Sequence, residues 1–419
     1  MGDGRHHPDR ARRRDADAAL LPLGLLLGLR RAADGHGDVP DRQPFSGVGA
    51  VAEIVIRNVR KEFGDFTAVE SSSFTVKSGE FFMLLGPSGC GKTTTLRMIA
   101  GLELPTSGEI LIDGEDVAQV PARGRDIAFV FQMFALYPHM TVRRNIAYPL
   151  VSQGMGRRDV KRKVQETARL LGIEALLDKG VSGLSGGDRQ RVALGRAIVR
   201  EPKAFLMDEP LGALDAEFRE HMAEELRALH DRMGATTVYV THDQLEAMQM
   251  GDKIVVMNHG VIEQWGAPQA IYDEPATMFV ADFIGSPPMN FLDCAGPLAA
   301  GADAVTLAGV RTPLPRLAEA APGARLALGV RPEHVRIDDD APFRGEVLAT
   351  EYLGTTQIAT LATACGAVKA RLSARARARV GETVGLSFLT RALSLFDRES
   401  GRALRLDRTA APALEAAHG

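Results

Sequence analysis

The stretch that decides the fold is Phe81-Phe82-Met83-Leu84-Leu85-Gly86-Pro87-Ser88-Gly89-Cys90-Gly91-Lys92-Thr93-Thr94. Its first five residues are apolar and predict a buried strand, a glycine-rich turn follows, and a helix is expected over 92–100. Glycines let backbone amides curl around phosphate oxygens, and a helix N-terminus favours anions. In this pattern Lys92 reaches the β and γ phosphates of a nucleotide, and the Thr93 hydroxyl binds Mg²⁺. Residues 86–94 are therefore candidate phosphate-binding residues, with Cys90 filling space rather than acting as a nucleophile.

Two later apolar runs end in polar residues. Ala204–Met207 is followed directly by Asp208 and Glu209, and Thr237–Val240 ends two residues before His242. Both runs are typical of buried parallel strands, whose carboxyl ends present polar side chains to a shared site. Asp208 is a candidate Mg²⁺ ligand, directly or through water, and Glu209 is placed to orient or deprotonate an attacking water.

The segment Leu184-Ser185-Gly186-Gly187, followed by Asp188-Arg189-Gln190-Arg191, resembles the signature of ATP-binding-cassette ATPases. Its position between the phosphate loop and Asp208 matches their layout. The resemblance implies that two cassettes meet head to tail, so that the Ser185 hydroxyl and the amides of Gly186 and Gly187 bind the γ phosphate of ATP held by the other subunit. A serine-glycine turn that merely caps a helix accounts for the composition but not for the neighbouring motifs.

Further markers of this family follow in order. Gln132 matches the glutamine loop, which senses Mg²⁺ and the attacking water. Gly212-Ala213-Leu214-Asp215 matches the loop after the catalytic acid, and His242 matches the switch histidine that contacts the γ phosphate. Phe63 occupies the place of the aromatic that stacks on adenine, an ordinary core phenylalanine being the alternative. The candidate site residues that the resemblance implies are catalytic Glu209, His242 and Gln132, the metal ligands Thr93, Gln132 and Asp208, and Phe63 and Asp215 at the nucleotide.

One residue departs from the signature: its fifth position is usually glutamine and here is Asp188. A carboxylate close to a triphosphate is repelled by it unless the carboxylate points away or pairs with a cation. Both alternatives stay open for Asp188, with Arg191 as an example of a neighbouring cation, and we therefore leave Asp188 out of the binding set.

Length and charge restrict the class of protein. The chain has 419 residues, of which 45% are hydrophobic and 25% charged, and this length favours two to three domains. Lys and Arg number 50 against 53 Asp and Glu, so no overall basic field favours nucleic acid. Three distant cysteines predict neither a disulfide framework nor a zinc site. The longest apolar run, Leu20–Leu29, is about half of the length that a membrane span needs.

Composition and hydrophobic pattern divide the chain into four segments. Residues 1–50 are interpreted as a flexible leader or a misassigned start, with Val51 as the hypothetical first residue. A secretory signal is the alternative, because Arg12–Arg14 precede the apolar run. An ATPase domain is expected over 51–288, with an amphipathic helix at 159–172. After the linker signal Ser286-Pro287-Pro288, short β-like pieces predict an all-β domain over 289–408, and 409–419 is expected to be a frayed tail.

Three segments resemble the ATPase subunits of carbohydrate importers of the maltose and glycerol-3-phosphate type, namely 131–142, 285–291 and 329–334. This resemblance implies an α/β P-loop NTPase with a RecA-like core and an α-helical signature subdomain, followed by an oligonucleotide-binding-like (TOBE-type) regulatory domain. It also implies ATP and Mg²⁺, a homodimer, two transmembrane permease subunits, an extracytoplasmic solute-binding protein, no nucleic acid, and a peripheral place on the cytoplasmic face of the cell membrane.

Other functions stay open at this point. An importer of the same build could carry polyamines, sulfate or iron, and a soluble cassette protein could act on ribosomes or DNA. A non-catalytic regulatory module is disfavoured, because Lys92, Asp208, Glu209 and His242 are all present. The ATPase subunit never touches the solute, so the sequence does not name it.

Overall fold

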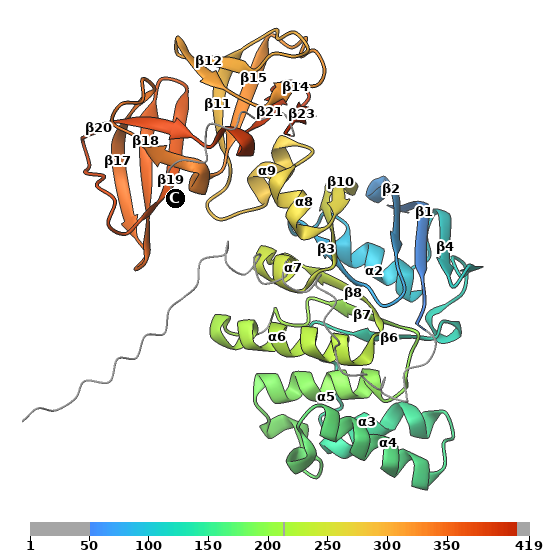
Figure 1. Ribbon diagram of the computed structural model, residues 1–419. Coiled ribbons are helices and arrows are strands. Elements are labelled where there is room, and N and C mark those ends of the chain that lie inside the picture. The colour runs from blue at the N-terminus through green and yellow to red at the C-terminus, as the bar shows by residue number, and fades with distance from the viewer. Residues whose placement is uncertain (1–50, 213, 409–419) are drawn as a thin grey trace, which may run out of the picture.

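The computed structural model describes residues 51–212 and 214–408 (Figure 1). The predicted leader, the predicted tail and Ala213 lie outside the described residues. Among the helices that are described, none has the length and apolar character needed to span a membrane. The helical part and the C-terminal β part lie at opposite ends of the molecule in Figure 1.

A six-stranded sheet carries the candidate site. Its order is β10-β9-β3-β8-β7-β6, with β10 antiparallel to its neighbour and the others parallel. The strands are β3 (Phe81–Leu85), β6 (Ile127–Val130), β7 (Ala204–Asp208), β8 (Thr236–Thr241), β9 (Lys253–Asn258) and β10 (Val261–Gly266). Every residue of β3, β7 and β8 is buried, because helices and a second sheet cover both faces. The predicted strands at 81–85, 204–207 and 237–240 are thereby confirmed.

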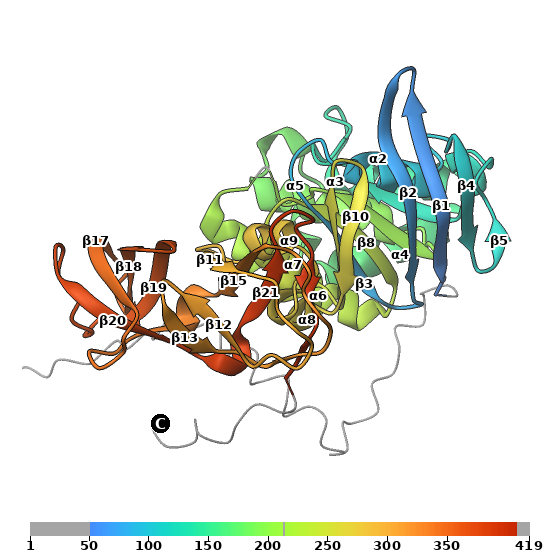
Figure 2. The same ribbon diagram turned by 90° about the horizontal axis from the view of Figure 1, so that it is seen from above.

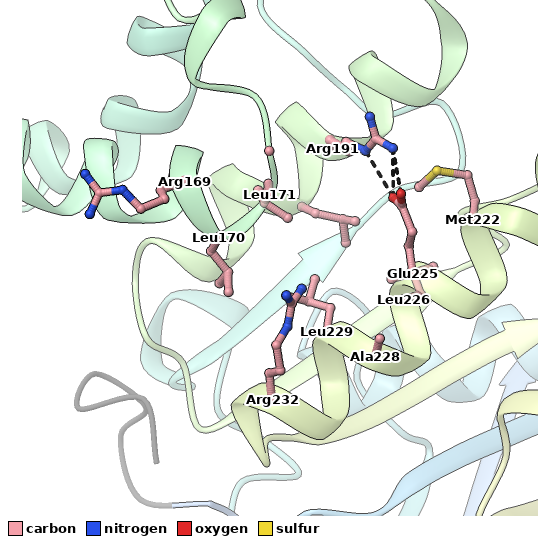
Figure 3. A pocket seen from close by; sticks show the side chains of 12 residues that line it. Arg169, Leu170, Leu171, Arg191, Met222, Glu225, Leu226, Ala228, Leu229 and Arg232 are labelled. Carbon is pink, nitrogen blue, oxygen red and sulfur yellow. Dashed lines mark hydrogen bonds and ion pairs between the residues drawn. The ribbon is translucent and has the colours of Figure 1, made fainter. Parts of the chain in front are cut away.

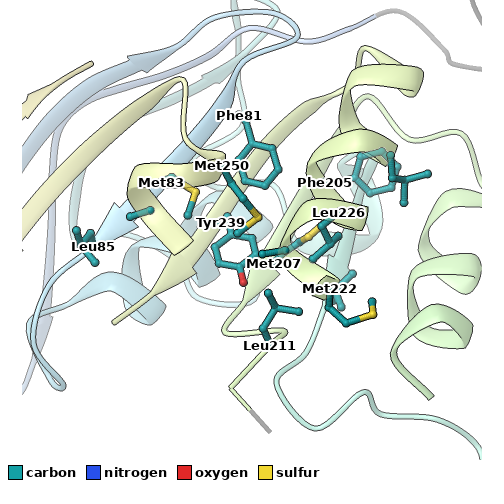
Figure 4. Packing of buried hydrophobic residues seen from close by; sticks show 14 of the residues in the cluster. Phe81, Met83, Leu85, Phe205, Met207, Leu211, Met222, Leu226, Tyr239 and Met250 are labelled. Atoms are coloured by element: carbon teal, nitrogen blue, oxygen red, sulfur yellow. The ribbon is translucent and has the colours of Figure 1, made fainter. Parts of the chain in front are cut away.

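Each face of this sheet has its own apolar cluster. On one face pack α5 (Gly186–Ile198), α6 (Ala216–Met233) and α7 (Gln244–Met250), and Figure 4 shows Phe81, Tyr239, Met250 and Leu226 meeting there. On the other face lies α2 (Lys92–Ala100), whose Leu96 and Ile99 contact a second cluster. Helices on both faces of a parallel sheet make this the expected α/β fold.

A second, antiparallel sheet covers α2 and lies at the far side from the C-terminal part (Figure 2). Its order is β2-β1-β4-β5, with β1 (Ile54–Phe63), β2 (Phe66–Val76), β4 (Ser107–Ile112) and β5 (Glu115–Asp116). The hairpin between β1 and β2 turns at Phe63 and Phe66, which pair directly.

Helices α3 (Val142–Ser152) and α4 (Arg157–Leu170) pack with α5 around a separate core that includes Ile146, Val164 and Val192. The helix predicted over 159–172 is α4, which begins two residues earlier and ends at Leu170. This bundle is the expected helical subdomain, and the C-terminal half of α5 joins it to the face of the main sheet opposite α2.

The C-terminal part is built of strands. Two short helices, α8 (Pro268–Asp273) and α9 (Met278–Phe283), lead into sheets ordered β11-β15-β21-β22 and β16-β20-β17-β18-β19. The strands are β11 (Asn290–Ala295), β12 (Ala304–Leu307), β13 (Val310–Pro313), β14 (Arg316–Leu317), β15 (Arg325–Val330), β16 (Val335–Ile337), β17 (Arg344–Tyr352), β18 (Thr356–Thr363), β19 (Gly366–Ser373), β20 (Thr383–Phe388), β21 (Ser394–Asp397), β22 (Ala403–Leu404) and β23 (Leu406–Asp407). The structure confirms the series of β-strands that was predicted after residue 289.

A buried arginine ties the two parts together. Arg331 is 2% exposed, and its guanidinium donates hydrogen bonds to the carbonyl oxygens of Tyr272, at 2.7 Å, and Ile284. The guanidinium carbon also lies 3.8 Å from the centre of the Tyr272 ring. Because a buried cation needs such partners, Arg331 fixes the β part against the helices that precede it.

Candidate active site

The loop between β3 and α2 is shaped by glycines. Gly86 and Gly91 have φ of +159° and +104°, and a Cβ on them would lie 2.2 Å from the Met257 carbonyl oxygen and 2.6 Å from that of Ala68. Side chains are therefore excluded at both positions. The loop exposes Ser88 and Gly89 at its tip, buries Cys90, and leads into α2, where Thr93 and Thr94 lie in the first turn.

Lys92 is the buried cation of this loop. It is 5% exposed, and its Nζ donates to the carbonyl oxygens of Gly86 and Pro87, each at 2.8 Å. These acceptors are neutral, so the charge of Lys92 would gain from an anion held in the loop. Burial also raises the pKa of the Cys90 thiol, which keeps the thiol protonated and fits a space-filling residue.

A hydroxyl and a carboxylate meet beside the loop. The Thr93 Oγ1 donates to Asp208 Oδ1 at 2.9 Å, and Asp208, the last residue of β7, is 7% exposed. Burial raises the pKa of Asp208, an effect that a nearby cation would oppose. Hard oxygen atoms suit Mg²⁺. No group of three or more His, Cys, Asp or Glu side chains among residues 51–212 and 214–408 could hold a metal, so phosphate or water oxygens would complete such a site.

Two side chains converge on one carboxylate oxygen of Glu209. Gln132 Nε2 donates to Glu209 Oε2 at 3.2 Å, and His242 Nδ1 lies 3.3 Å from the same oxygen. Glu209 follows Asp208 with a φ of 43°, a conformation that is costly for a residue with a side chain and is typical of functional sites. The structure thus brings Gln132, Glu209 and His242 together at the carboxyl end of the sheet, next to Asp208.

The remaining candidates lie elsewhere. Ser185 caps α5, whose C-terminal half packs on the other face of the main sheet from α2, and among the described residues no hydrogen bond joins Ser185 to the phosphate loop. Asp215 caps α6 by accepting a hydrogen bond from the Phe218 amide at 3.0 Å. Phe63 is 47% exposed at its hairpin, with Lys61 Nζ 4.6 Å from its ring centre, which rules out the core alternative and leaves the ring free to stack.

Asp188 contacts both a hydroxyl and a cation. Its Oδ2 accepts from the Ser185 hydroxyl at 2.8 Å, and its Oδ1 lies 3.7 Å from Arg191. Of the two alternatives, the structure therefore shows the contact with Arg191. Arg191, however, makes its shorter contacts with Glu225 of α6, at 2.8 to 3.1 Å (Figure 3). The negative charge of Asp188 is thus only partly balanced by Arg191. Its Oδ2 also accepts the hydroxyl hydrogen of Ser185, which is then not available to another acceptor.

Comparison with known proteins identifies the family. Residues 69–212 match the family described as ABC transporter, residues 285–335 the MalK OB fold domain, and residues 328–396 the TOBE domain. The chain is 46% identical over 374 residues to the trehalose/maltose import ATP-binding protein MalK of Thermococcus litoralis, which covers 84% of this chain and 100% of the relative. The chain belongs to the ABC transporter family.

Other members of the ABC family are similar to this chain over most of its length or over about half of it. The trehalose import ATP-binding protein SugC of Mycobacterium tuberculosis is 45% identical over 399 residues, covering 86% of this chain and all of the relative. The sn-glycerol-3-phosphate import ATP-binding protein UgpC of Cereibacter sphaeroides is 46% identical over 357 residues, with 84% and 100% covered. Among solved structures, cbiO1 of Clostridium perfringens, described as part of the ABC transporter complex cbiONQ, has a TM-score of 0.50 at 27% identity and covers 53% of this chain and 90% of its own.

Membership of the ABC family settles the general activity. The chain is a nucleotide-binding protein and an ATPase, and the expected α/β ATPase fold with a C-terminal oligonucleotide-binding-like part is confirmed. One feature of this ABC ATPase was not predicted from the sequence, namely the buried carboxylate of Glu246 and its partly buried neighbour Arg219. The available signal was weak, because Glu246 follows two other polar residues, Asp243 and Gln244, and its burial could not be read from the sequence.

Proposed function

We propose that this chain is the ATP-hydrolysing subunit of an importer for a sugar or sugar phosphate. The convergence of Gln132 and His242 on Glu209, beside the phosphate loop, supports hydrolysis. The relatives above are named for the import of trehalose, maltose and glycerol 3-phosphate. These names favour sugars over polyamines, sulfate or iron, and favour import over action on ribosomes or DNA.

In the proposed mechanism ATP binds with its phosphates in the loop at 86–94, where Lys92 neutralises the β and γ phosphates. Thr93, Asp208 and Gln132 would hold Mg²⁺, which supplies positive charge against the phosphate oxygens when bound. Glu209 orients the attacking water and accepts its proton, and His242 keeps the Glu209 carboxylate oriented and contacts the γ phosphate. Phe63 stacks on the adenine.

A second copy completes each site. Because α5 and α2 pack on opposite faces of the main sheet, we place the 185–187 segment of one subunit on the ATP of the other, with Asp215 near the shared face. ATP then bridges the closed dimer, whereas ADP and phosphate do not, so that binding and hydrolysis shift a two-state equilibrium.

The permease subunits would dock beside Gln132. A groove of ≈ 440 Å³ opens there between Phe131, Tyr137, Tyr148 and Arg196. Met133 is 79% exposed on the same loop. Arg196 shapes the loop by donating to the Ala135 carbonyl oxygen at 2.7 Å. An exposed apolar surface around the loop that carries Gln132 suits short helices of two transmembrane subunits, which would receive the closing motion.

The remaining assignments follow from this function. We place the chain peripherally on the cytoplasmic face of the cell membrane, with an extracytoplasmic solute-binding protein acting on the permease. We also keep 51–288 as the ATPase domain and 289–408 as the regulatory domain.

The test is a pull-down of the tagged full chain from its own membranes, followed by mass spectrometry and an ATPase assay with candidate sugars and their binding protein. We expect two multi-span subunits and stimulation of hydrolysis by a sugar. Recovery of ribosomes or DNA, or stimulation only by a polyamine or an inorganic ion, would contradict the proposal.

Replacing Asp188 with glutamine is expected to lower the KM for ATP. The change removes a negative charge near the γ phosphate and gives the Ser185 hydroxyl, which now donates to Asp188 at 2.8 Å, a weaker, neutral acceptor. Removal of one partly screened negative charge beside the phosphate is expected to lower the KM about 2- to 5-fold. The measurement is a steady-state ATP titration, with Asp178→Asn as the control, because Asp178 is an exposed acid paired with Arg143 outside the site. An unchanged or higher KM for Asp188→Gln would show that the carboxylate points away from the nucleotide.

A further inference from the structure

A buried carboxylate lies just behind the candidate switch histidine. Glu246, in the first turn of α7, is 5% exposed. Its Oε2 accepts hydrogen bonds from the Tyr239 hydroxyl at 2.9 Å and from Thr241 Oγ1 at 2.7 Å. Tyr239 itself is fully buried in the apolar cluster of Figure 4. Such a group is costly to bury, and the hydrogen bonds hold it in one orientation.

The same group fixes the backbone on both sides of His242. Thr241, which donates to Glu246, also accepts a hydrogen bond from the Asp243 amide at 2.9 Å. Asp243 Oδ1 then caps α7 by accepting from the amides of Leu245 and Glu246, at 2.8 and 3.3 Å. The residues before and after His242 are therefore anchored, although the His242 side chain is itself 53% exposed.

Arg219 of α6 connects this anchor to a second loop. Its Nη2 donates to the Leu214 carbonyl oxygen at 2.9 Å, and its Nη1 lies 3.4 Å from Asp243 Oδ2. Its Nε lies 3.9 Å from Glu246 Oε1, too far for a hydrogen bond, and within the described residues this buried Nε has no hydrogen-bond acceptor. A displacement of less than about 1 Å would form that bond.

We propose that Glu246 and Arg219 are positioning residues for hydrolysis, which hold His242 against Glu209 and link its loop to the carbonyl of Leu214. The inference rests on the proposed role of His242. Among the described residues, neither side chain makes a hydrogen bond or ion pair with the phosphate loop or with Glu209. A movement of Leu214 and Asp215, which we place near the second subunit, would change the Arg219 contacts and thereby the distance from His242 to Glu209.

Arg219→Gln and Glu246→Gln test the proposal in the purified full chain. Each variant keeps hydrogen-bonding groups but removes a charge from the link. Since a misplacement of about 1 Å costs up to about 100-fold in rate, we expect kcat to fall about 10-fold while the KM for ATP stays within about 2-fold. Arg219→Lys should recover part of kcat, because it restores the charge.

Arg227→Gln is the matched control. Arg227 is a second partly buried arginine of α6, which donates to the Met250 carbonyl oxygen at 2.6 Å and pairs with Asp231 at 2.9 Å, without a contact to the His242 loop among those described. It should lower the thermal midpoint about as much as Arg219→Gln does and leave kcat unchanged. A similar loss of kcat in Arg227→Gln would reduce Glu246 and Arg219 to ordinary structural residues.

A double-mutant cycle with His242→Ala tests whether Arg219 affects kcat through His242. If Arg219 acts through His242, Arg219→Gln lowers kcat in the wild-type background but causes no further loss in His242→Ala. Equal losses in both backgrounds would overturn the inference alone. An unchanged kcat in His242→Ala would instead overturn the assignment of His242, and this inference with it.

Discussion

Replacing Glu209 with glutamine is expected to lower kcat by about 10²- to 10⁴-fold while ATP binds with unchanged affinity. The amide is isosteric with the carboxylate and can still contact Gln132 and His242, which lie 3.2 and 3.3 Å from Glu209 Oε2. It cannot accept a proton from water. Turnover therefore stops at the proton transfer, whereas the phosphate loop, which Glu209 does not form, still binds ATP.

This variant should also accumulate a closed dimer in ATP. Hydrolysis is the step that removes the bridging γ phosphate, so a chain that binds but does not hydrolyse ATP stays in the closed state. Gel filtration with Mg²⁺ and ATP should show a dimer for Glu209→Gln at concentrations at which the wild type is monomeric.

Glu80→Gln is the control for Glu209→Gln. Glu80 is a similarly covered acid, with a side chain 11% exposed, at the amino end of β3 and thus at the opposite end of the sheet, where it pairs with Lys253 at 3.4 Å. Its kcat should stay within about 2-fold of the wild type. Normal hydrolysis by Glu209→Gln would mean that another group takes the proton.

Local sequence signals predicted much of this architecture. The helix predicted over 92–100 has those bounds because Gly91 and Gly101, with φ of 104° and 68°, interrupt the backbone at its two ends. The strand ends at Asp208 and near His242 were readable because continuous apolar runs stop there. Polar residues that follow neighbouring parallel strands come together, so the meeting of Glu209 and His242 was within reach of the sequence.

Contacts between residues of separate helices could not be predicted from the sequence. The link from Arg219 to Glu246 depends on how α6 and α7 pack on the main sheet, and no spacing along the chain encodes that packing. The same holds for Arg191, where the expected partner Asp188 lies one helical turn away, but the shorter bonds go to Glu225 on another helix. Side-chain partners across elements are set by tertiary geometry, which periodicity does not report.

Replacing Lys92 with alanine is expected to weaken ATP binding by about 30-fold to more than 1,000-fold. Lys92 is 5% exposed, and truncation of one partner of a buried, hydrogen-bonded charge pair costs about 2–5 kcal/mol. The phosphates would lose their buried counter-charge, and the carbonyl oxygens of Gly86 and Pro87 would lose their shared donor. Titration with a fluorescent ATP analogue measures the loss directly, with Lys77→Ala, an exposed lysine before β3, as the control.

Thermal unfolding separates lost binding from lost folding in Lys92→Ala. At an ATP concentration of about 100 times the wild-type Kd, binding stabilises the wild type by about 2.7 kcal/mol, whereas a variant with a 100-fold weaker Kd gains only about 0.4 kcal/mol. A folded variant that ATP no longer stabilises would support the role of Lys92. Lys92→Arg then separates charge from shape, because the planar guanidinium keeps the charge but does not fit between two carbonyls that each lie 2.8 Å from an ammonium. If Lys92→Arg binds ATP as the wild type does, positive charge alone suffices; if it fails as alanine does, the loop selects the compact ammonium, and its glycine-determined shape matters as much as its field.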